Sequence, residues 1–89
     1  MSDAVVSELR EQITAVDREL VAAVNRRLEI VRRLHDHKRE HGIPLRDHGR
    51  EDEMLRLLAG ENGGPLSEGG LTDFYRYVLD LTRRELHGD

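Results

Sequence analysis

The chain has 89 residues, of which 37% are hydrophobic, 36% are charged and 3% are aromatic, and its formal net charge is −4. A chain of this size buries only about 60–65% of its unfolded surface when it folds alone, so we expect a single small domain, residues 1–89, that gains from a partner chain. The negative charge disfavours general nucleic-acid binding, and the lack of cysteine excludes disulfides and a thiol nucleophile.

The first predicted element is a long helix. Residues 1–41 contain neither glycine nor proline. Within them one row of positions recurs at alternating spacings of three and four, the period of a helix that packs against other helices. About 35 helical residues extend roughly 50 Å, which is more than the rest of the chain can cover, so we expect this helix to pack against a second copy. The row, called the seam below, consists of Arg10, Ile13, Asp17, Leu20, Val24, Arg27, Val31, Leu34 and Lys38.

Charged residues interrupt this otherwise apolar seam. A buried charge costs several kcal/mol unless it is paired, so the cations Arg10, Arg27 and Lys38 point to a site that receives anions. Alternatively, these side chains lie at the edge of the seam, with their charged ends in water and their stems over apolar neighbours. For Asp17 we favour pairing with nearby cations over contact with a substrate.

The second half of the chain predicts two shorter helices. Gly42 and Pro44 end the first helix, because glycine suits the position after a helix and proline cannot continue it. The next helix begins near Asp47 or His48. Residues 60–65, which are rich in glycine, are expected to form a loop.

A third, amphipathic helix is expected to begin between Ser67 and Leu71 and to end at Gly88. No segment alternates with a period of two, so strands are not expected. The fold class is therefore all-α, with one long, one short and one medium helix.

Three segments together resemble the all-helical, AroQ-class chorismate mutases over nearly the whole chain. The C-terminal residues 81–89 are similar to those of short actinobacterial members. The resemblance implies an intertwined helical homodimer with shared active sites, no cofactor, and a place in aromatic amino acid biosynthesis by the shikimate pathway. It also implies DAHP synthase as a candidate partner, because some short members are activated by it. The matching segments are Leu9-Arg10-x-x-Ile13-x-x-x-Asp17, Asn25-Arg26-Arg27 with Lys38, and Gly42-Ile43-Pro44-Leu45-Arg46-Asp47 with Arg50-Glu51.

The implied activity is that of an isomerase (intramolecular transferase) that converts chorismate to prephenate by a Claisen rearrangement. This reaction needs no nucleophile, metal or proton transfer. The enzyme has to hold the enolpyruvyl group over the ring and stabilise the negative charge that develops on the ether oxygen. Cations fixed in a dry helical bundle can do both.

The resemblance assigns the three seam cations to catalysis. Arg10 would reach from one protomer into the site of the other and bind a substrate carboxylate. Arg27 would bind a carboxylate within its own protomer, because its planar guanidinium suits bidentate contact. Lys38 would donate to the ether oxygen and to a carboxylate, and would be the main stabiliser of the transition state.

Further substrate-binding roles fall on the second and third helices. By resemblance, Asp47 (through its backbone) and Glu51 would hold the ring hydroxyl, and Arg50 would help to position the substrate. Thr82 matches a serine of the family. It would bind a carboxylate or, with equal weight, satisfy its own backbone.

The third helix departs from the family pattern at one position. Four residues after the serine, family members place a glutamine that donates to the ether oxygen, whereas this chain has Leu86 there and Glu85 one residue earlier. Glu85 would have to be protonated to donate. Without either donor, Lys38 would stabilise the oxygen alone, and losing one such donor typically costs about 10²–10³ in rate.

Three alternatives remain open at the level of sequence. The same scaffold suits a 4-amino-4-deoxychorismate mutase or an isochorismate-pyruvate lyase, and a non-enzymatic helical dimerisation or regulatory module would use the seam charges only to set register. The five histidines lack metal-motif spacing. We therefore expect no metal. No apolar run reaches membrane-spanning length and no signal-peptide pattern is present, so we expect a cytoplasmic protein.

Overall fold

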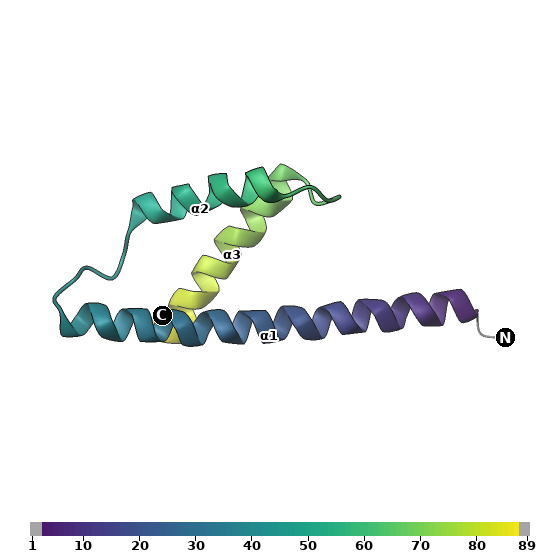
Figure 1. The fold of residues 1–89 in the computed structure, drawn as a ribbon, viewed down its shortest axis with the longest axis horizontal. Helices are drawn as coiled ribbons and strands as arrows, with labels where there is room; N and C mark the ends of the chain where they lie inside the picture. The colour runs from purple at the N-terminus through teal and green to yellow at the C-terminus, as the bar shows by residue number, and fades with distance from the viewer. Residues whose placement is uncertain (1–2, 88–89) are drawn as a thin grey trace. The chain divides into compact units, whose positions relative to one another are not determined.

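Three α-helices form the described part of the chain. The computed structural model describes residues 3–87, and within this range it contains helices and connections but no strand. Helix α1 spans Ala4–Glu40, α2 spans His48–Glu61 and α3 spans Glu68–His87 (Figure 1). The predicted all-α architecture of one long, one short and one medium helix is confirmed. None of these helices combines the length and the apolar character that crossing a membrane requires.

The chain divides into two compact units. The first unit ends at Arg33 and holds most of α1. The second unit begins at Leu34 and holds the last turns of α1 together with α2 and α3, and the latter two pack against each other.

Large apolar side chains are exposed along helix α1. None of its 37 residues is buried, and the side chains of Ile13 and Ile30 are 59% and 61% exposed. Fully burying one such side chain stabilises a protein by about 1.5–3 kcal/mol, and most helices in proteins depend on this packing for their stability. The large apolar residues exposed on α1 are Val5, Val6, Leu9, Ile13, Val16, Leu20, Val21, Ile30 and Leu34.

A glycine ends α1, as the sequence predicts. Gly42 has a φ of +65°, a left-handed conformation that disfavours side chains. Its N–H donates to the carbonyl of Arg39 at 3.4 Å, and the N–H of Ile43 donates to the carbonyl of Lys38 at 2.8 Å. These two bonds form a Schellman motif, which satisfies the final carbonyls of α1 and turns the chain toward α2.

Helix α2 begins at a side-chain cap. Asp47 has extended backbone angles, and its Oδ1 accepts a hydrogen bond from the N–H of Arg50 at 3.1 Å. The helix ends where the N–H of Asn62 donates to the carbonyl of Leu58 at 3.0 Å. The expectation that Gly60 belongs to the following loop is wrong, because α2 continues to Glu61. An internal glycine costs a helix only about 1 kcal/mol, and α2 continues for two residues, Gly60 and Glu61, up to the cap at Asn62.

Among the described residues, the buried side chains belong to helix α3. Leu71, Tyr75, Val78 and Thr82 are each no more than 9% exposed, and their spacings of three and four place them on one face. Phe74, on the same helix, is 51% exposed. The predicted stop at Gly88 lies outside the described residues.

Candidate active site

Lys38 is anchored near the end of α1. Its side chain is half-buried, and its Nζ donates to the carbonyl of Leu45 at 3.3 Å. Leu45 follows the turn at Gly42 and Pro44, so this bond links the ammonium to the connection that leads into α2. An ammonium has three donors, and a bond to a neutral carbonyl does not neutralise its positive charge.

The carboxylates in the first turn of α2 differ in their burial. Glu51 is half-buried, whereas Asp52 and Glu53 are exposed. The carboxylate of Asp47 serves as the helix cap. Arg50 pairs with Glu53 at 3.6 Å, with both side chains more than half exposed, and such a pair contributes little to stability.

Thr82 lies on the buried face of α3 and hydrogen-bonds within its own helix. Its Oγ1 donates to the carbonyl of Val78 at 2.7 Å. A hydroxyl has a single proton to donate, so in this structure that proton goes to the backbone. One turn later Leu86 is half-buried, while Glu85 is exposed. Leu86 therefore follows Thr82 on the packed side of α3, and Glu85 does not.

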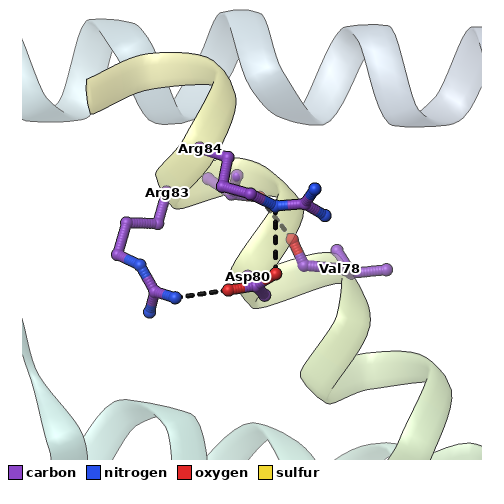
Figure 2. A network of polar contacts seen from close by, with 5 residues as sticks. Val78, Asp80, Arg83 and Arg84 are labelled. Carbon is purple, nitrogen blue, oxygen red and sulfur yellow. Dashed lines mark hydrogen bonds and ion pairs between the residues drawn. The ribbon is translucent and has the colours of Figure 1, made fainter. Parts of the chain in front are cut away.

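On the exposed side of the same turns of α3, the carboxylate of Asp80 pairs with two arginines. Figure 2 shows Arg83 and Arg84 reaching Asp80, and Nε of Arg84 lies 3.0 Å from Oδ2 of Asp80. Arg84 also lies over the ring of Tyr77, 5.6 Å from its centroid. The hydrogen bond to Tyr77 and the charge of Asp80 raise the pKa of Arg84. These contacts tie the two arginines to α3 itself.

The two remaining predicted residues belong to the first unit. Arg10 is exposed and Arg27 is half-buried, both on α1. Lys38, Asp47, Arg50, Glu51 and Thr82 all belong to the second unit. Helix α1 thus supplies all three seam cations, and the second unit supplies the candidates on α2 and α3.

Sequence reasoning missed a contact between the ends of α1 and α3. The rings of His35 and His87 stack with their centroids 5.0 Å apart, and Nη2 of Arg39 lies 3.5 Å from Nδ1 of His87. In the sequence, the spacing of the histidines is informative only about metal binding. Two residues so far apart in sequence leave no periodic signal that they meet.

Three of the candidate residues have half-buried charged groups. A half-buried ammonium and a half-buried guanidinium lie on one helix, and a half-buried carboxylate, Glu51, lies at the start of the next. Charges in partly dry surroundings interact more strongly than charges in water. Cations of this kind can bind carboxylates and stabilise a developing negative charge.

Comparisons with known proteins show the family of the chain and the likeness of its fold. Two solved structures of chorismate mutase from Thermus thermophilus, Form I and Form II, are each 27% identical to this chain, with a TM-score of 0.83. Each match covers 86% of this chain, and they cover 96% of the Form I chain and 88% of the Form II chain. No curated protein matches the chain. The family model of chorismate mutase type II matches residues 9–86, and the chain therefore belongs to the chorismate mutase type II family.

Proposed function

We propose that this chorismate mutase rearranges chorismate to prephenate in a pocket where Lys38 binds the ether oxygen of the substrate. The observation that supports this most directly is the placement of Lys38. Its half-buried ammonium is held 3.3 Å from the carbonyl of Leu45, at the connection that leads to Asp47 and Glu51. A cation fixed in this way does not have to reorganise when charge develops on the substrate.

Charge balance assigns the carboxylates of the substrate to the arginines. Chorismate is a dianion, and Arg27 is half-buried on the same helix as Lys38. Lys38 is eleven positions after Arg27, which is about three turns at about 3.6 residues per turn. The two side chains therefore project from α1 in similar directions. Arg27 would bind one carboxylate bidentately, which leaves Lys38 for the ether oxygen.

The start of α2 would bind the ring hydroxyl. Glu51 is half-buried and can accept a hydrogen bond from it, and Asp47 would contribute its backbone because its carboxylate caps α2. Arg50, at present paired with Glu53, would help to position the substrate. Thr82 would contribute through its hydroxyl oxygen as an acceptor and as a packing residue, since its proton goes to Val78.

A second copy of the chain would complete each site. The support is the exposed apolar face of α1, none of whose residues is buried. Two copies packed along this face would form an intertwined homodimer in which residues 1–89 make one domain with their partner. Arg10 of each chain would then enter the site of the other.

Dimer formation predicts that stability depends on protein concentration. Sedimentation at micromolar concentrations is expected to show a dimer whose unfolding midpoint rises with concentration. Ile13→Asp, on the exposed apolar face, is expected to shift the protein toward monomer or unfolded chain. Ala15→Asp introduces the same charge on the opposite side of α1 and is expected to leave the dimer intact. A folded wild-type monomer at all concentrations would rule out the dimer.

Introducing the glutamine that this chain lacks is expected to raise activity. Leu86 occupies the half-buried position one turn after Thr82, so Leu86→Gln would add a donor to the ether oxygen. We expect turnover to rise by up to about 10²-fold, because one such donor is typically worth about 10²–10³ in rate. Glu85→Gln is the matched control, since its exposed side chain would leave turnover unchanged. Equal rates for Leu86→Gln and wild type would show that position 86 does not face the substrate.

One assay tests the proposed function. Purified protein is incubated with chorismate, the loss of the diene absorbance is followed, and the product is identified. Prephenate supports the proposal. Salicylate or pyruvate formed from isochorismate would indicate the lyase, faster turnover of 4-amino-4-deoxychorismate would indicate the amino-substrate mutase, and no turnover of any of them would indicate a non-enzymatic module.

The cellular setting is part of the same proposal. The enzyme would work in the cytoplasm in aromatic amino acid biosynthesis. DAHP synthase is the candidate protein partner, and adding it to the assay would raise turnover if the two proteins form a complex. No change in rate or in sedimentation on mixing would exclude that partnership.

A further inference from the structure

Three side chains join the last turns of α1 to the last turn of α3. The rings of His35 and His87 stack with an interplanar angle of 23° and centroids 5.0 Å apart. Nη2 of Arg39 approaches Nδ1 of His87 at 3.5 Å. Both rings are half-buried. Nδ1 of His35 is buried without a hydrogen-bond partner among the described residues.

The contact with Arg39 determines which form of His87 fits. A guanidinium has only donors, so Nδ1 of His87 has to accept and therefore has to be unprotonated. A proton on Nδ1 would set a donor against a donor and a positive charge against a positive charge. The contact therefore requires neutral His87, with its proton on Nε2.

His35 is also in surroundings that oppose protonation. Burial lowers the pKa of His35 below its usual range, and the charges of His87, Arg39 and Lys38 lower it further, while Asp36 acts in the opposite direction. Asp36 is 62% exposed and pairs with Arg39 at 3.6 Å, so its charge is partly screened by water and partly balanced. The remaining neighbours from both helices are cationic or become so on protonation.

We propose that His35, Arg39 and His87 form a pH-sensitive clasp that holds the end of α3 against α1 at neutral pH and opens on acidification. The clasp is a property of the fold and does not rest on the proposed function. Stacked neutral rings attract each other. Two imidazolium rings beside a guanidinium repel one another, and the buried Nδ1 of His35 would have to carry an unpartnered proton.

The sign of the pH dependence follows from proton uptake. The unfolded or opened chain binds protons at the ordinary histidine pKa of about 6.5, whereas the closed clasp disfavours the proton on His35. The open form therefore binds more protons as the pH falls, and the closed form loses stability. The contribution of the clasp is fully present above the ordinary histidine pKa and is lost below it.

Hydrogen exchange of the backbone amides tests this directly. Protection of residues 83–87, corrected for the intrinsic exchange rate, is compared at about pH 7.5 and pH 5.5, where histidine changes charge. Residues 71–78 of α3 serve as the internal reference. We expect protection of the last turn to fall about three- to tenfold relative to the reference. An equal change in both segments, or none, would overturn the proposal.

Variants separate the clasp from general acid sensitivity. The double substitution His35→Phe and His87→Phe keeps two stacking rings but cannot take up a proton, so the relative loss of protection should vanish. His41→Gln removes an exposed histidine that lies outside the clasp and should leave the loss unchanged. A pH response retained in the double variant would contradict the proposal.

Ring nitrogen NMR of the wild-type protein gives a second test that needs no variant. It should show His87 protonated at Nε2 and bare at Nδ1 near neutral pH. The opposite tautomer would contradict the clasp.

Discussion

Lys38→Ala is expected to lower the turnover of chorismate by about 10²–10³-fold or more, the typical cost of removing a preorganised donor to a developing negative charge. The helical content should not change, because alanine favours helices and Lys38 makes only one hydrogen bond with its side chain among the described contacts, to Leu45. Steady-state kinetics should show the loss in kcat, since the interaction strengthens in the transition state.

Two variants sharpen this result. Lys38→Arg keeps a cation near the ether oxygen and should retain more activity than Lys38→Ala. Arg32→Ala removes an exposed cation from the same helix and should leave turnover unchanged. Near-normal kcat in Lys38→Ala would remove Lys38 from the mechanism.

Arg10→Ala is expected to lower kcat/KM by about 10²-fold or more, since removing one partner of a buried, hydrogen-bonded charge pair costs about 2–5 kcal/mol. The effect is notable because Arg10 is exposed in its own chain. An exposed side chain with no structural role normally changes stability by about 0.5 kcal/mol or less. A large kinetic loss without a change in folding would therefore place Arg10 at a site that its own chain does not show.

The position of Arg10 on α1 leads to the same conclusion. Twenty-eight residues separate Arg10 from Lys38, and they rise about 40 Å along an α-helix. One small dianion cannot touch both side chains of one chain. If both residues bind substrate, Arg10 has to come from a second chain that runs antiparallel to the first. Full activity in Arg10→Ala would instead favour the interpretation in which Arg10 lies at the edge of the seam with its charge in water.

Much of the fold could be predicted because it is determined locally. The absence of breakers before Gly42 predicts the length of α1, and the positive φ of Gly42 explains why the helix ends there. Asp47 can cap a helix from its own side chain, and the structure confirms this. The third helix was expected to be amphipathic, and helical periodicity places Leu71, Tyr75 and Val78 together on its packed face.

Local pattern leaves some choices undetermined. Gly60 is compatible with a helix and with a loop, and the cap at Asn62 decided in favour of the helix. Thr82 can donate to a ligand or to its own backbone, two alternatives that the sequence leaves open, and the structure shows the bond to Val78. The stack of His35 on His87 depends on how α1 and α3 meet, which neither helix encodes by itself.

The candidate site was predictable to different degrees. The anion-binding character of the seam follows from charges at packing positions, so Arg10, Arg27 and Lys38 emerge from spacing and electrostatics. The roles of Asp47, Arg50, Glu51 and Thr82 came from family resemblance, because spacing alone does not assign a substrate contact to a single polar residue. The half-burial of Glu51 beside exposed acidic neighbours supports that choice on physical grounds.

Subunit exchange between inactive variants tests the shared site most directly. Arg10→Ala and Lys38→Ala homodimers are mixed under conditions that exchange chains, and exchange is verified by mass-tagged subunits. Each heterodimer would have one site with both lesions and one intact site, so its activity should recover to about half that of wild type.

Mixing Arg27→Ala with Lys38→Ala is the matched control. Both residues are proposed to act within one protomer, so every site in that heterodimer would carry one lesion and no activity should return. Recovery in the first mixture alone is the predicted result. Verified exchange without recovery in the first mixture would contradict an active site built from two chains.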